Sequence, residues 1–171
     1  MPGWLPTWIL HFCQWLDQTP FGHELRESLY LFPVIETFHV FGIVSLVTSA
    51  FLLDLRLFGI GPMKDEPVEK LAKWILPWVI AGFSIQFVSG VLMFSAEATR
   101  AAVNSFFWIK MFAILGAGIN ALIFHTTVYK QVGSWNNARV APVGARAYGM
   151  FSIFLWLSII TLGRWFSFHL T

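Results

Sequence analysis

The stretch from Leu31 to Leu57, LFPVIETFHVFGIVSLVTSAFLLDLRL, constrains the fold more than any other part of the chain. It is apolar over 27 residues, and a helix of about 20 residues crosses the hydrocarbon core of a bilayer at about 1.5 Å per residue. Ionisable side chains inside such a segment are costly unless they face a partner, so Glu36 and His39 predict a site. They are three residues apart and share one helix face. Gly42 follows, where a flat or bulky group can approach the backbone.

Composition indicates that the whole chain is a membrane protein. Its 171 residues are 57% hydrophobic and 12% charged, about half the charge of an average soluble domain. The predicted fold is all-α, an integral membrane, antiparallel four-helix transmembrane bundle with an N-terminal amphipathic interfacial helix. Residues 1–29 form the interfacial segment and residues 30–171 the transmembrane domain, with spans at about 31–57, 71–97, 105–129 and 147–168. A net charge of +2 is too small to indicate nucleic acid, so the expected partner is the lipid bilayer and no nucleic acid.

Basic residues predict the orientation of these spans. The loops after the first and third spans, with their helix ends, hold Arg56, Lys64, Lys70, Lys73, Lys130, Arg139 and Arg146. The opposite side holds Arg26, Arg100, Lys110 and Arg164. The positive-inside rule therefore predicts cytoplasmic loops and two periplasmic termini, in a bacterial inner membrane.

Four ionisable groups are predicted at a similar depth in the outer half of the bundle: Glu36, His39, Lys110 and Arg164. One charge near a helix end can reach the interface alone, but four at one level predict a shared polar cavity. Gly90 would contribute to its wall. The alternative is a structural ion-pair network in which Glu36 pairs with Lys110 or Arg164.

His125 is predicted at the opposite end of the bundle. By rise per residue, His39 lies about 12 Å inside the outer surface and His125 about 6 Å inside the inner one. Across a core of about 30 Å they cannot hold one metal within one chain, so they are candidate metal ligands of separate sites. His125 either belongs to a second site near Asp54 and Arg56, or is an interface residue bonded to Asp54 or a lipid headgroup. His169 is a further candidate ligand beside the first cavity.

The residues of the outer cavity suit haem b. An imidazole (His39) ligates iron, a glycine (Gly42) admits the macrocycle, and Lys110 and Arg164 pair with the propionates. Glu36 would orient His39 or relay a proton. The absence of a C-x-x-C-H motif excludes attachment of haem c. The five methionines are scattered, which argues against a copper route.

Several motifs support these assignments by resemblance. ETFHVFG, DLRLFG, AGFSIQFVSGVLMF, WIK and GRW resemble an uncharacterised bacterial family of small four-span membrane proteins. More distantly, the chain resembles the haem-binding protoporphyrinogen oxidase of bacteria and the copper-resistance D family. The shared positions are His39, Arg56, Trp108 with Lys110, and His125, and the resemblance implies haem b with functional roles for His39 and Lys110. The chain departs from that oxidase at His125-Thr126, where the oxidase has a doubled His, and in its N-terminal amphipathic segment.

The expected function is that of a b-type haem membrane protein that transfers electrons, as the membrane subunit or anchor of a redox system. One alternative is an enzyme, a haem-dependent oxidase of a tetrapyrrole or quinol. Another is a non-redox structural partner or a carrier of a metal or small molecule. The sequence leaves open whether the protein is an enzyme. Small residues in the second and third spans permit close packing against a second copy of the chain or a redox partner protein.

Overall fold

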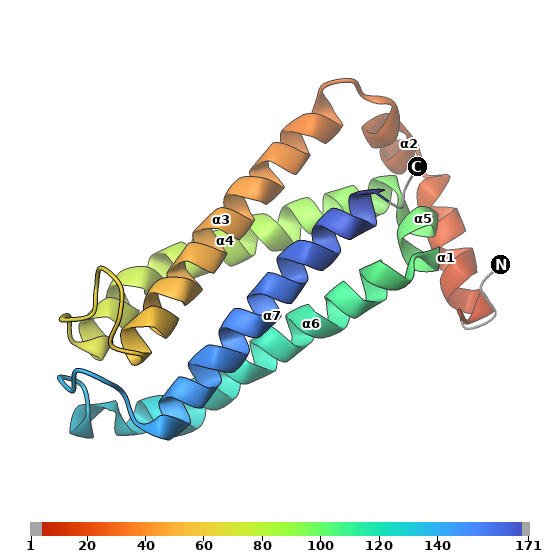
Figure 1. Cartoon of the computed structure of the whole chain (residues 1–171). Helices are drawn as coiled ribbons and strands as arrows, with labels where there is room; N and C mark the ends of the chain where they lie inside the picture. Colours follow the sequence, from red (N-terminus) through yellow and green to blue (C-terminus); the bar gives the residue numbers. More distant parts are fainter. Residues whose placement is uncertain (1–4, 169–171) are drawn as a thin grey trace.

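A computed structural model describes residues 5–168 of the chain, and over that range the protein is all-helical, without strands. Two short helices, α1 (Thr7–Asp17) and α2 (Pro20–Glu27), come first. The remaining elements are, in order, α3 (Leu31–Leu57), α4 (Val68–Ala96), α5 (Ala98–Val103), α6 (Ser105–Ile123), a π-helical turn (Phe124–Val128), a 3-10 segment (Tyr129–Ser134) and α7 (Val143–Phe168) (Figure 1).

Four helical segments are long and apolar enough to cross a membrane, which supports a multi-pass membrane protein: Leu31–Leu57, Val68–Ala96, Ser105–Ser134 and Val143–Phe166. The first has the predicted bounds, and the others differ from prediction by a few residues. The second begins at Val68 because Asn136 caps it. The backbone N–H of Val68 donates to the Asn136 carbonyl at 3.2 Å, and that of Glu69 donates to Asn136 Oδ1 at 2.9 Å. This cap comes from 67 residues further along the chain, so the local pattern could not predict it.

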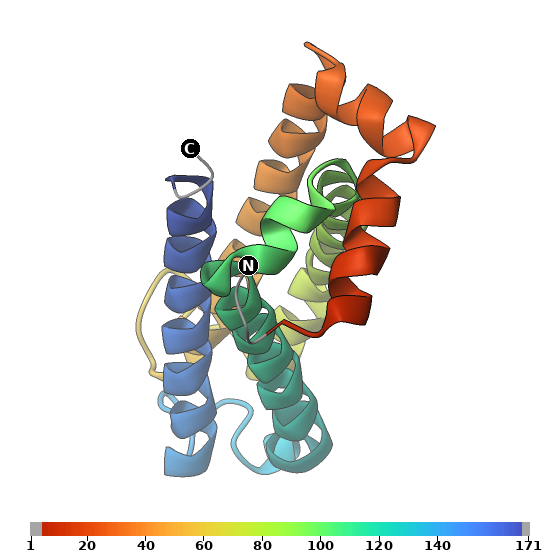
Figure 2. The same ribbon diagram turned by 90° about the vertical axis from the view of Figure 1, so that its right-hand side faces the viewer.

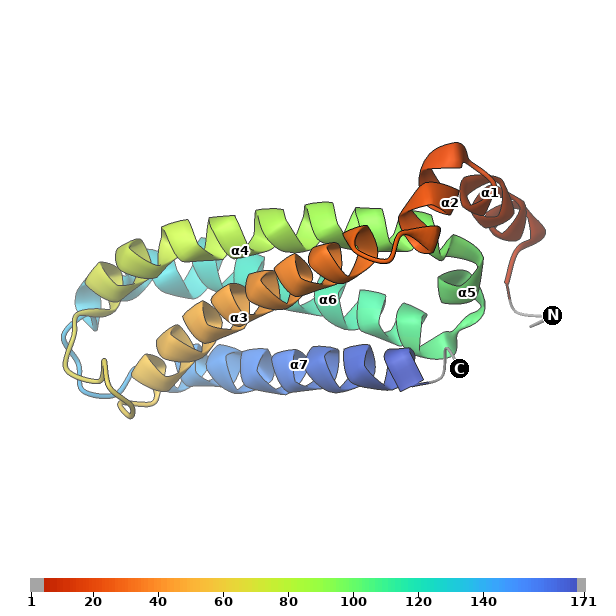
Figure 3. The same ribbon diagram turned by 90° about the horizontal axis from the view of Figure 1, so that it is seen from above.

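The long helices form two antiparallel hairpins, α3 with α4 and α6 with α7 (Figures 1 and 3). The hairpins meet along α3 and α7. Within the first hairpin, Gly42 and Gly82 allow the two backbones to approach closely: a Cβ on Gly82 would lie 3.0 Å from the Gly42 carbonyl oxygen. We call the helix ends covered by α1, α2 and α5 the α1 end. The opposite ends, with the loops 58–67 and 135–142, are the loop end.

Arg56 organises the loop end. Its side chain is only 2% exposed, and its guanidinium donates to three loop carbonyls, those of Glu66, Asn136 (3.4 Å) and Ala138 (3.1 Å). An apolar core surrounds it, made of Leu57, Val68, Phe124, Val132, Trp135, Ala141 and Ala145. Arg56 therefore joins the two loops. It does not pair with Asp54, although the two residues look like a charged pair in the sequence.

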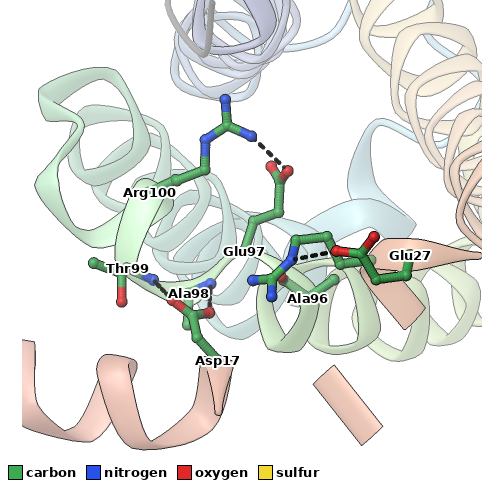
Figure 4. Close-up of polar contacts among 8 residues, drawn as sticks. Asp17, Glu27, Ala96, Glu97, Ala98, Thr99 and Arg100 are labelled. Carbon is green, nitrogen blue, oxygen red and sulfur yellow. Dashed lines mark hydrogen bonds and ion pairs between the residues drawn. The ribbon is translucent and has the colours of Figure 1, made fainter. Parts of the chain in front are cut away.

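The α1 end is built on a cap supplied by α1. The carboxylate of Asp17 accepts hydrogen bonds from the backbone N–H groups of Ala98 (2.8 Å) and Thr99 (3.1 Å), the first turn of α5 (Figure 4). Cys13 of α1 packs beside it on two alanines of α5. In consequence α1 lies against α5 at this end of the molecule (Figure 2).

The opposite face of α1 is aromatic and exposed, with Trp8, Phe12 and Trp15 pointing away from the protein. Such a face suits the headgroup region of a bilayer, where aromatic rings are enriched. The location of α1 in the membrane interface stays a prediction.

Candidate functional site

His39 makes a polar contact between the two helices of the first hairpin. It lies eight residues after the first residue of α3 (31 to 39), and Ser89 lies seven residues before the last residue of α4 (89 to 96). The two residues are therefore level, and His39 Nδ1 lies 2.8 Å from Ser89 Oγ. Ser89 is only 4% exposed, whereas His39 is partly buried.

The partners of Ser89 decide the tautomer of His39. A serine hydroxyl has one hydrogen to donate, and that of Ser89 goes to the carbonyl oxygen of Ile85, one turn earlier on α4. The Ser89 oxygen must therefore accept from His39, so we assign the proton of the neutral imidazole to Nδ1. Nε2 then carries a lone pair, which is the form in which histidine binds a metal while a hydrogen bond orients the ring.

Gly90, which the sequence predicted at the wall of a shared cavity, borders the imidazole. A Cβ at this position would lie 3.5 Å from His39 Cε1, an ordinary van der Waals contact. Nearer the α1 end, Phe94 stacks on Phe107 of α6 with 5.6 Å between ring centroids. The first hairpin therefore reaches the second hairpin just beyond His39.

Lys110 faces the same region from the second hairpin. Its chain lies over Gly163 of α7, where a Cβ would be 3.5 Å from Lys110 Nζ. Lys110 is close enough to His39 for its charge to act on the imidazole. Among residues 5–168, no hydrogen-bond or ion-pair partner of the Lys110 ammonium is found. His39 on α3 and Lys110 on α6 are thus close enough for an electrostatic interaction, although no direct contact joins the two side chains within the described residues.

The other residues predicted for this cavity are Glu36, Arg164 and His169. Glu36 is exposed, and within the described range it forms no ion pair with Lys110 or Arg164, so the alternative of a Glu36 ion-pair network is not present there. Arg164 is exposed at the α1 end of α7. His169 lies outside the described residues.

The surroundings of Gly42 contradict the role predicted for this residue. We predicted that it leaves room for a macrocycle beside His39. Instead a Cβ there would lie 2.9 Å from Ile85 Cγ2 and 3.2 Å from the Gln86 backbone nitrogen. The space beside Gly42 is occupied by α4, because α3 and α4 approach closely at this point. Gly42 is a packing residue of the hairpin.

His125 does not meet Asp54 at the loop end. It is exposed on the π-helical turn, and its ring packs edge-on against Phe124 and Tyr129, with centroids 5.5 and 5.2 Å away. Asp54 lies instead against α7. Over the described residues there is no group of three or more His, Cys, Asp or Glu side chains that could hold a metal ion. The second site that we considered around His125, Asp54 and Arg56 is therefore not assembled in this range.

Ser89 is the functional candidate that sequence reasoning missed. Its signal was available, since a hydroxyl inside an apolar span at the depth of His39 is a natural partner for that imidazole. Serine hydroxyls in membrane helices, however, commonly bond to the carbonyl one turn earlier. The sequence around such a serine therefore does not indicate whether its oxygen also accepts a hydrogen bond from another helix.

Comparison with known proteins places the chain only at the level of a family. The model of a family described as "Family of unknown function (DUF6644)" matches residues 28–169. This range includes all four long helices and the residues His39, Ser89 and Lys110. No curated protein and no solved structure matches the chain. The predicted resemblance to an uncharacterised family is thus confirmed, while nothing in the comparisons supports the more distant resemblance to haem-binding proteins.

Proposed function

Because this chain belongs to the DUF6644 family, whose function is unknown, we propose from the chemistry of its site that it is a membrane protein that binds haem b and transfers electrons. The observation that carries the proposal is the pairing of His39 with Ser89. It presents an imidazole with a free Nε2 lone pair within an apolar helix. A single oriented imidazole suits a metal that brings its other ligands with it, as the iron of a porphyrin does.

Lys110 is the second support for haem. An ammonium without a partner in a membrane helix is costly, and an anionic group held beside it would offset that cost. The propionates of a haem are such groups. Lys110 belongs to the other hairpin, where its ammonium lies over Gly163 of α7, and its charge acts on His39.

The residues fit this cofactor in part. His39 would supply the axial ligand, held by Ser89, and Lys110 would pair with a propionate. Arg164 lies at the same end of the bundle as Lys110, where it can serve a second propionate. Glu36 is exposed, and the space beside Gly42 is occupied by α4, so neither residue is included in the proposed site. When bound, haem supplies a centre that accepts and releases one electron, and the protein residues hold and orient it.

Lys110 also favours a second candidate function. An ammonium that has no hydrogen-bond or ion-pair partner in the described part of the chain, and whose charge acts on an imidazole, suits the carboxylates of a tetrapyrrole substrate as well as those of a cofactor. An oxidase of a tetrapyrrole or quinol would therefore use the same residues. Turnover of such a substrate by the isolated protein would favour the enzyme over the electron carrier.

The visible spectrum of the full-length protein, purified from cells supplied with haem precursor, tests the proposal. We expect a Soret band, and a sharp band in the reduced protein that is typical of haem b. His39→Ala should remove or strongly alter both bands. The matched control is His125→Ala, an exposed histidine at the other end of the bundle, which should keep them. Protein without a Soret band would overturn the haem proposal, and an unaltered spectrum in His39→Ala would overturn the ligand assignment.

A further inference from the structure

Asp54 is a buried carboxyl group outside the proposed haem site. It lies three residues before the end of α3 and is only 5% exposed. A Cβ on Gly149 of α7 would lie 3.5 Å from Asp54 Oδ1, from Leu57 Cδ1 and from Phe58 Cε2. The carboxyl group is therefore pressed against the backbone of α7, between two apolar side chains.

Few polar groups surround the Asp54 carboxyl group. Its Oδ2 atom is buried and has no hydrogen-bond partner within residues 5–168. The hydroxyl of Ser152, three residues after Gly149 on α7, is the polar group that acts on the carboxyl. In the same range no lysine, arginine or histidine forms an ion pair with Asp54.

The cationic groups of the loop end form no ion pair with Asp54 within the described residues. Arg56 donates to the loop carbonyls of Glu66, Asn136 and Ala138. The Nε of Arg146, one turn before Gly149 on α7, is buried without a hydrogen-bond partner inside the described range, so it gives nothing to Asp54. His125 is exposed and packs on Tyr129. Tyr148, also on α7, packs into the apolar core of the loop end.

An ionised carboxylate in such a place is expensive. Removing a charge from water costs several kcal/mol even after relaxation of the protein, and one neighbouring hydroxyl does not offset this. The neutral acid carries no such cost, and its carbonyl oxygen can still accept a hydrogen bond from the Ser152 hydroxyl. We propose that Asp54 is a proton-binding site, which holds a proton at the contact between α3 and α7 and exchanges it with the aqueous side at the loop end.

The position of Asp54 supports this direction of exchange. Three residues of helix separate it from the end of α3, about 5 Å along the axis. His39 is fifteen residues away (54 to 39), about 22 Å. The contact of α3 with α7 also joins the two hairpins. Loss of the proton would place a charge in that contact and weaken the association of the hairpins.

Infrared spectroscopy of the full-length protein in lipid nanodiscs tests the site. At neutral pH we expect the carbonyl stretching band of a protonated carboxylic acid, shifted in D2O and missing from Asp54→Asn. Asparagine has nearly the same shape and stays neutral, so the fold should persist. The matched control is Glu36→Gln, which removes an exposed carboxyl of the same helix and should keep the band. An Asp54 that contributes only carboxylate bands at neutral pH would overturn the proposal.

Two further measurements cover the cases in which Asp54→Asn does not fold or the site binds Na⁺ instead of a proton. If Asp54→Asn does not fold, Ser152→Ala replaces it. Loss of the hydroxyl should shift the band to higher frequency, and an unshifted band would contradict the assigned partner. The spectrum is also recorded with excess Na⁺ in place of K⁺. We expect no change, and loss of the acid band in Na⁺ alone would identify a sodium site and overturn the proton proposal.

Discussion

His39 Nδ1 and Ser89 Oγ lie 2.8 Å apart across the α3–α4 interface, and this one hydrogen bond determines which imidazole nitrogen is available as a ligand. Since the Ser89 hydrogen is donated to Ile85, the proton between the two side chains belongs to His39. The bond also restrains the ring against rotation, as partners of metal-binding histidines generally do.

Replacing Ser89 by alanine should weaken haem binding while leaving the helices in place. Loss of such an orienting partner typically lowers metal affinity by about 10–100-fold. Titration of the apoprotein with haem, followed at the Soret band, measures this change. Ser95→Ala is the matched control, because Ser95 is also buried on α4 but its hydroxyl bonds, among the residues described, only to the Val91 carbonyl. Equal losses in both variants would indicate a general packing effect.

Lys110→Met should also reduce haem affinity, because it removes the charge while keeping most of the chain length. A charge-assisted hydrogen bond contributes about 1.5–3 kcal/mol, which corresponds to about 10–150-fold in affinity. Lys110→Arg should restore much of the loss. Lys73→Met is the comparison, since Lys73 is exposed and pairs with Glu69 at 2.7 Å. A Lys110→Met protein that binds haem as the wild type does would contradict the propionate assignment.

Gly82→Ala should destabilise the protein. The new Cβ would lie 2.9 Å from the Leu46 backbone nitrogen and 3.0 Å from the Gly42 carbonyl oxygen, and neither backbone can move without separating α3 from α4. Overpacking of this kind typically costs about 1–3 kcal/mol. Thermal unfolding in detergent, followed by circular dichroism, should show a lower Tm. The matched control is Gly118→Ala, because no atom of the described residues outside its own stretch of helix lies within 4 Å of the new Cβ. It should leave the Tm unchanged or raise it, since alanine favours helix.

Cys13 reports on the attachment of α1. The thiol is 1% exposed, and burial, together with the nearby charge of Asp17, raises its pKa above the ordinary value. Since the thiolate is the reactive form, alkylation in the native protein should be slow near neutral pH and speed up as the pH rises through that raised pKa. Mass spectrometry of iodoacetamide-treated protein measures the rate.

Asp17→Ala should make that alkylation faster. It removes the carboxylate that caps α5, a change that typically costs about 1 kcal/mol, and it also removes the negative charge beside the thiol. Glu27→Ala, at an exposed position of α2, should leave the rate unchanged. An unaltered rate in Asp17→Ala would mean that α1 is held by its apolar contacts alone.

The helices were largely predictable, and the site was predictable in part. Apolar segments of sufficient length indicated all four long helices. The depth of each polar residue predicted His39 and Lys110 at one level, and the charge of Lys110 acts on the imidazole. Depth did not predict the surroundings of Gly42, Glu36 and His125, because the position of a residue along a helix does not determine its direction around the helix axis. Gly42 faces α4, whereas Glu36 and His125 are exposed.

The sequence by itself determined that this chain forms long apolar helices, because backbone groups in hydrocarbon must be hydrogen-bonded within their own segment. It could not determine how each helix is rotated, since a span that is apolar all round gives no strong preference for one inward face. Only the tertiary structure set that rotation. It joined His39 to Ser89, turned Arg56 toward the loop carbonyls, and placed Asp54 against α7, where its Oδ2 atom has no hydrogen-bond partner within residues 5–168.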